Sequence, residues 1–60
     1  MMGINLPAES PAPMSSLLYN LGQIEEREGV KARSIELYKR SLALREHPEV
    51  RAALQRVEQR

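Results

Sequence analysis

Four consecutive ionisable residues, Glu25-Glu26-Arg27-Glu28, are the part of the sequence whose residue types come closest to acid–base chemistry. Two carboxylates act as general acid and base when a substrate pocket holds them and separates their pKa values. The run lies at the predicted end of a helix, and no other segment of the sequence supplies a nucleophile, an oxyanion hole or a pocket. We therefore predict that the chain is not an enzyme, and we interpret the run as a solvated face or as carboxylates that pair with Lys31 and Arg33 across a turn.

The composition limits the other classes of function. The 60 residues include one histidine, His47, and no cysteine, so we predict no metal site, no disulfide and no cofactor. Nine basic and eight acidic residues give a net charge of +1, which argues against a dedicated nucleic-acid binder. The sequence contains neither an apolar run of the roughly 20 residues that span a bilayer nor the pattern of a secretory signal. We expect no membrane partner and a cytoplasmic location.

The elements that position these residues follow from a change of composition near residue 15. Residues 1–14 hold three of the four prolines, and we expect a disordered proline-rich tail or linker there. Residues 15–60 show helical spacing of apolar residues and predict an all-α domain of three helices. The expected helices cover about 15–28, 31–46 and 48–60, with the first two antiparallel.

The first predicted helix has a start signal, an end signal and an apolar face. Ser15 or Ser16 can cap its start, because a serine hydroxyl accepts a hydrogen bond from an unpaired backbone N–H. Gly29 marks its end, since glycine tolerates the left-handed conformation that follows many helices. The apolar residues that recur at helical spacing are Leu17, Leu18, Leu21 and Ile24.

The second and third predicted helices are also marked by spacing. Glu36 and Arg40 form a favourable i,i+4 pair on the second helix. Pro48 suits the first position of the third helix, where its missing N–H would be unpaired anyway, and we interpret His47 as the residue that starts that helix. A narrow apolar stripe on the third helix can close one side of a core. Its members are Val50, Ala53, Leu54 and Val57.

One motif connects the first two helices. Leu18 and the pair Leu21-Gly22 are followed by Ser34, twelve residues after the glycine, and by Tyr38, four residues later. The motif resembles the tetratricopeptide repeat, whose signature is a large apolar residue, Leu-Gly, a small residue, an aromatic residue four positions later and a closing proline. Gly22 is costly inside a helix, so its presence predicts that the partner helix packs closely there.

The same motif predicts a core and departs from the family pattern at three positions. We expect the space around Gly22 to be filled by Leu18, Leu21, Tyr38 and Leu42. Glu25 stands where the family usually has an aromatic residue, and Val30 stands where an aspartate often caps the second helix. Pro48 comes about two residues later than in the family, so the second helix or its exit turn is longer here.

The resemblance implies that the chain is a protein–protein interaction module, an adaptor or scaffold that binds a peptide or helix of a partner. In this family the first helix lines a concave groove. By that resemblance Tyr19, Asn20, Gln23 and Arg27 are the partner-binding residues, and Ser16 and Glu26 face the same groove. The amide of Asn20 offers both a donor and an acceptor for a ligand's backbone.

A single repeat predicts self-association as well. Arrays of this kind need about three repeats to bury a continuous core, so one repeat and one helix are incomplete. We expect a homodimer or higher oligomer, formed by stacking or exchange of the third helix through Val50, Leu54 and Val57. Two alternatives stay open. The chain could be a docking fragment of a larger protein, or a three-helix nucleic-acid-binding module with the second helix as its basic element.

Overall fold

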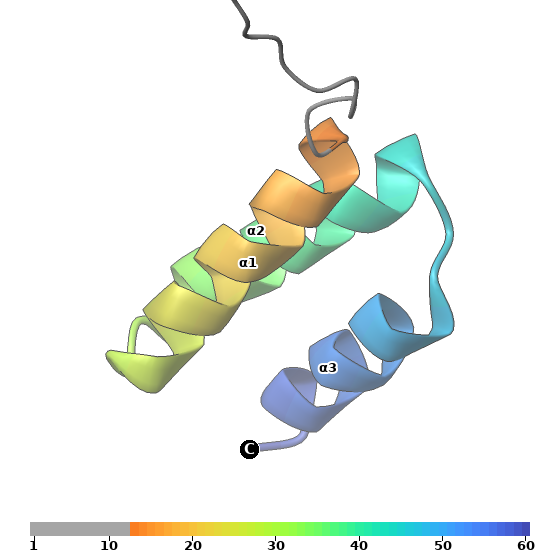
Figure 1. The fold of residues 1–60 in the computed structure, drawn as a ribbon. Helices are drawn as coiled ribbons and strands as arrows, with labels where there is room; N and C mark the ends of the chain where they lie inside the picture. Colours follow the sequence, from red (N-terminus) through yellow and green to blue (C-terminus); the bar gives the residue numbers. More distant parts are fainter. Residues whose placement is uncertain (1–12) are drawn as a thin grey trace, which may run out of the picture.

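The computed structural model describes residues 13–60, which form three helices in the order α1 (Met14–Arg27), α2 (Lys31–Leu44) and α3 (Pro48–Glu58) (Figure 1). α1 and α2 run antiparallel, and α3 returns along them (Figure 1). The all-α prediction and the order of the helices are confirmed, and the predicted ends differ from the observed ones by at most two residues. The tail expected over residues 1–14 falls largely on residues 1–12, outside the described residues.

The sequence signals predicted the C-terminal end of α1 correctly but not its N-terminal cap. The N-cap is Pro13, in an extended conformation with ψ 154°, and its carbonyl accepts from the backbone N–H groups of Ser16 and Leu17. Among residues 13–60 no side chain caps this end, so the prediction of a serine cap was wrong. The other end agrees with the prediction, because Gly29 takes φ +83° and turns the chain into α2. Such a φ is accessible to glycine without steric cost.

The hairpin of α1 and α2 is packed through a tyrosine and small residues. Tyr38 is fully buried, and its ring lies directly on the backbone of Gly22. A Cβ added at Gly22 would stand 2.7 Å from Cε1 of Tyr38, which is closer than real Cβ contacts. Ser34 and Ser41 are also buried, and the Ser41 hydroxyl donates to the carbonyl of Ser15 at 2.7 Å. The predicted close approach is therefore present, with the tyrosine ring as the group that requires it.

α3 completes the core against α2. The core is formed by Tyr38 together with Val50, Ala53, Leu54 and Val57, which are between 1% and 7% exposed. The helix begins as predicted, since Pro48 occupies its first turn and Nδ1 of His47 accepts from the N–H of Glu49 at 3.2 Å. The three residues predicted to mediate self-association thus lie in the chain's own core. They can serve a contact between copies only if α3 is exchanged.

The side of α1 that faces away from this core carries four of the six large apolar residues that are exposed among residues 13–60. Leu17, Leu21 and Ile24 are 50%, 40% and 45% exposed, and Met14 is 60% exposed. Of the residues predicted around Gly22, Tyr38 lies there as expected, whereas Leu21 is 40% exposed on the outer side of α1, so its assignment to the core was wrong. Within residues 13–60, no helix combines the length and the hydropathy that crossing a membrane requires.

Candidate functional site: the groove between α1 and α3

Two hollows lie between α1 and α3, and together they define what we call the α1–α3 groove. The first has a volume of about 350 Å³ and the second about 330 Å³. The six α1 residues expected to face a groove all line these hollows, three in each. They are Ser16, Tyr19 and Asn20 in the first, and Gln23, Glu26 and Arg27 in the second. Their positions agree with the sequence analysis, and their role in binding stays a prediction.

The first hollow is lined mainly by polar groups from all three helices and the α2–α3 link. Arg45 and His47 of the link and Glu49 of α3 stand opposite the α1 residues. Asn20 is exposed, whereas Tyr19 is half-buried and tilts its ring at 45° to that of Tyr38, with the centroids 5.7 Å apart. The hollow therefore combines exposed polar groups with a tyrosine that the core holds in place.

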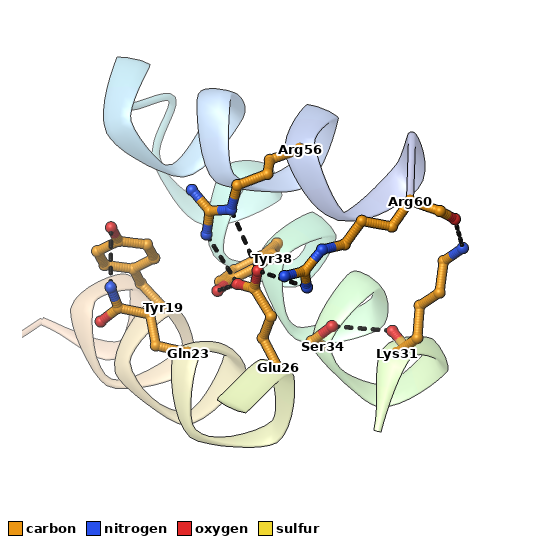
Figure 2. A network of polar contacts seen from close by, with 8 residues as sticks. All are labelled: Tyr19, Gln23, Glu26, Lys31, Ser34, Tyr38, Arg56 and Arg60. Atoms are coloured by element: carbon orange, nitrogen blue, oxygen red, sulfur yellow. Dashed lines mark hydrogen bonds and ion pairs between the residues drawn. The ribbon is translucent and has the colours of Figure 1, made fainter. Parts of the chain in front are cut away.

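Gln23 of the second hollow is bonded to Tyr19 of the first. Its Nε2 donates to the hydroxyl of Tyr19 at 3.2 Å, across one turn of α1 (Figure 2). The four predicted binding residues thus fall into two kinds. Tyr19 and Gln23 are half-buried and bonded to each other, while Asn20 and Arg27 are exposed and form the accessible part of the α1 wall.

The second hollow is organised around the carboxylate of Glu26, whose side chain is 10% exposed. The hydroxyl of Tyr38 on α2 donates to Oε1 at 2.8 Å (Figure 2). The guanidinium of Arg56 on α3 makes a two-pronged contact, from Nη2 to Oε1 at 2.8 Å and from Nε to Oε2 at 3.1 Å. Arg60 adds a bond from Nη1 to Oε2 at 3.2 Å. One α1 side chain thereby joins all three helices.

The environment of Glu26 favours its charged form. The hydrogen bonds from Arg56, reinforced by the one from Tyr38, hold the pKa of the Glu26 carboxyl below its ordinary value of 4.5, and its partial burial opposes them. Burial, together with donation to this carboxylate, raises the pKa of Tyr38 above its ordinary range, so the phenol remains a donor. The contact is thus a charge-assisted one, which is stronger than a neutral hydrogen bond.

The second hollow carries a positive charge in spite of Glu26. Arg27, Arg56 and Arg60 supply three cations and Glu26 supplies one anion, which leaves a net charge of +2 in a chain whose total is +1. Arg27 is exposed, and the Arg56 and Arg60 side chains are 55% and 58% exposed, so the guanidinium groups remain accessible from the solvent. Among residues 13–60 no carboxylate lies within ion-pair distance of Arg27, so an anionic group could bind to Arg27 without displacing one of them. Within residues 13–60, no cluster of three metal-ligating side chains occurs.

The α3 wall of the groove was not predicted. The acidic run was expected to be a solvated face or to pair with Lys31 and Arg33; Glu28 is exposed, and Glu25 lies 4.0 Å from Arg33. Glu26 turns to α3 instead, and Lys31 donates to the main-chain carbonyl of Arg60 at 2.7 Å. The signal available in the sequence was the i,i+4 spacing of Arg56 and Arg60, which places both on one face of the third helix.

Comparisons with known proteins found no relative of the chain. No protein-family model, no curated protein and no solved structure matches the chain.

Proposed function

We propose that the chain is a protein-binding module with the architecture of a single tetratricopeptide repeat and a capping helix, and that it binds a peptide segment of a partner in the α1–α3 groove. The observation that carries the proposal is the position of the six α1 residues, which all face α3 across the two hollows. The contact of Gly22 with Tyr38 supports the resemblance to the repeat, because a Leu-Gly pair in that family accommodates a closely packed second helix.

The groove has the character of a recognition surface. The exposed amide of Asn20 can bond both to an N–H and to a carbonyl of an extended peptide backbone. The net charge of +2 in the second hollow favours an acidic side chain at that end of the peptide, because guanidinium groups bind carboxylates in two-pronged geometry. We therefore propose a partner segment that contains at least one aspartate or glutamate. The groove offers neither a nucleophile paired with a base nor a metal-ligand cluster among residues 13–60, which is why we propose binding and not catalysis.

A nucleic-acid partner has less support. Three basic side chains of α2 lie within ion-pair distance of a glutamate, which reduces the positive charge that phosphates would meet. The pairs are Arg33 with Glu25, Lys39 with Glu58, and Arg40 with Glu36, the last at 3.3 Å as its i,i+4 spacing predicted.

The proposal is tested by titrating fluorescent peptide pools against the full chain and against Asn20→Ala/Arg27→Ala. We expect pools that contain an acidic residue to bind more tightly than pools of equal length with that residue replaced by its amide. The double variant should weaken binding about tenfold or more, as expected for the loss of contacts that hold a ligand. Arg40→Ala/Gln55→Ala is the matched control, because it removes one guanidinium and one amide at exposed positions outside both hollows.

Equal binding by the two double variants would contradict the groove as the binding site. Preference for basic peptides would contradict the role given to the arginines. Binding of duplex DNA with a steep dependence on salt, in the absence of peptide binding, would replace the proposal by the nucleic-acid alternative.

A further inference from the structure

We propose that a second copy of the chain packs on the outer face of α1 through Met14, Leu17, Leu21 and Ile24, in an antiparallel arrangement about a twofold axis. We call these four residues the α1 stripe. They are 40–60% exposed, and they lie on the side of α1 away from the buried core and the groove. The inference does not depend on the proposed function, because none of the four residues lines either hollow.

The spacing of the α1 stripe argues for a second copy. Its residues follow one another at intervals of three, four and three, which is the spacing that keeps apolar residues on one seam between two helices. This series reads the same from both ends. In an antiparallel pair each apolar residue therefore meets another one: Leu17 faces Leu21 of the second copy, and Met14 faces Ile24. A twofold contact needs a surface that complements itself in this way.

The charges of the hairpin select the antiparallel direction. The first half of α1 carries no charged side chain, while its last turn and the residue after it carry Glu25, Glu26, Arg27 and Glu28, with a net charge of −2. A parallel pair would bring the glutamates of both copies together. The antiparallel pair moves them to the other end of the partner, where the hydrogen bond between Ser41 and Ser15 places the last turns of α2 beside the start of α1. Arg40 lies in those turns and already pairs with Glu36 at 3.3 Å, so the antiparallel direction follows from the separation of the glutamates of the two copies.

The core is small, so a contact between two copies would add to the stability of the fold. Six hydrophobic residues are buried in the described chain, and no disulfide is available to stabilise it. Domains of this size commonly add stability by oligomerisation. The α1 stripe spans only about 15 Å of helix, which is short for a protein interface, so we expect a reversible dimer with a dissociation constant on the order of 10 µM.

The test is sedimentation equilibrium of the full chain over about 1 µM to 1 mM, with two charge variants at the same positions. Leu17→Glu/Leu21→Glu places like charges opposite each other in the antiparallel pair and should remove the dimer. Leu17→Glu/Leu21→Lys places opposite charges there and should dimerise at least about tenfold more tightly than the first variant. Ala52→Glu, at an exposed site on α3, is the control that should leave the dimer unchanged.

Circular dichroism shows whether each variant is folded. Should both double variants unfold, Leu21→Gln alone changes one half-exposed side chain and should weaken the dimer about tenfold. A wild-type chain that remains monomeric up to the highest concentration would overturn the proposal. The α1 stripe would then be a contact surface for residues 1–12 or for another protein. Equal association of the two charge variants would also overturn the proposal, because the predicted pairing would then be wrong.

Discussion

The two long faces of α1 differ in chemistry and in what they contact. The groove face presents Tyr19, Gln23 and Glu26, which are half-buried and bonded to neighbouring side chains. The outer face presents the α1 stripe, which is apolar and 40–60% exposed. The more strongly apolar face is thus the one that residues 13–60 leave about half-exposed. In a small domain, the face that holds the fold together and the face with the most regular apolar spacing need not coincide.

The largest loss of unfolding free energy is expected for truncation of Tyr38, which lies behind the groove face. Tyr38→Ala removes a fully buried ring and the donor to Glu26, and should cost about 3–5 kcal/mol of unfolding free energy. That is close to the whole stability of a domain of this size, so the variant should be largely unfolded. Urea denaturation followed by circular dichroism measures it. Leu17→Ala, on the half-exposed outer face, is the comparison and should cost about 1 kcal/mol or less. A cost as large for Leu17→Ala would contradict the division into two faces.

A smaller effect is expected at the carboxylate that joins the helices. Glu26→Gln keeps the shape of the side chain but removes the charge that Arg56 and Arg60 meet, and should cost about 2 kcal/mol at neutral pH. Glu28→Gln, at an exposed site beyond the end of α1, is the control and should change the free energy of unfolding by less than about 0.5 kcal/mol.

The dependence on pH separates the charge of Glu26 from its packing. Because Arg56, Tyr38 and Arg60 hold the pKa of Glu26 in the folded state below 4.5, this stabilisation is complete above that pH and is lost as the pH falls through the folded-state value. The difference between wild type and Glu26→Gln should therefore shrink on acidification below about pH 4.5. Some acid sensitivity should remain in the variant, since the contact with Arg51 also lowers the pKa of the exposed Glu46. A difference that stayed constant down to low pH would show that packing and not charge stabilises this site.

The smallest effect on folding is expected at the outer face. Leu21→Gln, measured at concentrations well below the dimer's dissociation constant, should change the free energy of unfolding by about 0.5 kcal/mol or less, because the side chain is already 40% exposed. The same substitution should alter association, as proposed above. A large loss of stability in the dilute monomer would place Leu21 in the core after all.

Local signals in the sequence predicted the helices well. Gly29, Pro48 and the spacing of apolar residues each act within a few residues, so they give the boundaries without knowledge of the fold. The serine cap was wrong because the helix begins at Met14, which places Ser15 and Ser16 inside its first turn and makes Pro13, a residue with no capping group in its side chain, the N-cap.

Packing was predicted less completely. Helical spacing identifies an apolar stripe, but it does not say whether the stripe meets another helix of the same chain. Leu21 and Tyr38 were both expected beside Gly22 on the repeat-like motif, whereas Tyr38 is buried there and Leu21 is 40% exposed. The α1 wall of the groove followed from the repeat-like motif. The α3 wall did not, because it depends on contacts such as Glu26 with Arg56, thirty residues apart.

The way in which α3 is attached to the α1–α2 hairpin determines how the groove can open. α3 packs on α2, and it follows an extended link in which Arg45 and His47 have ψ angles of 122° and 127°. One wall of the groove and its floor thus belong to the α1–α2 hairpin, and the other wall is a short helix on an extended connection. Units of this kind can detach by local unfolding while the remainder of a domain stays folded. Amide hydrogens of α3 should then exchange with solvent sooner than those in the middle of α2. A ligand that bridges the two walls would slow that exchange, and part of its binding energy would be spent on keeping α3 in place.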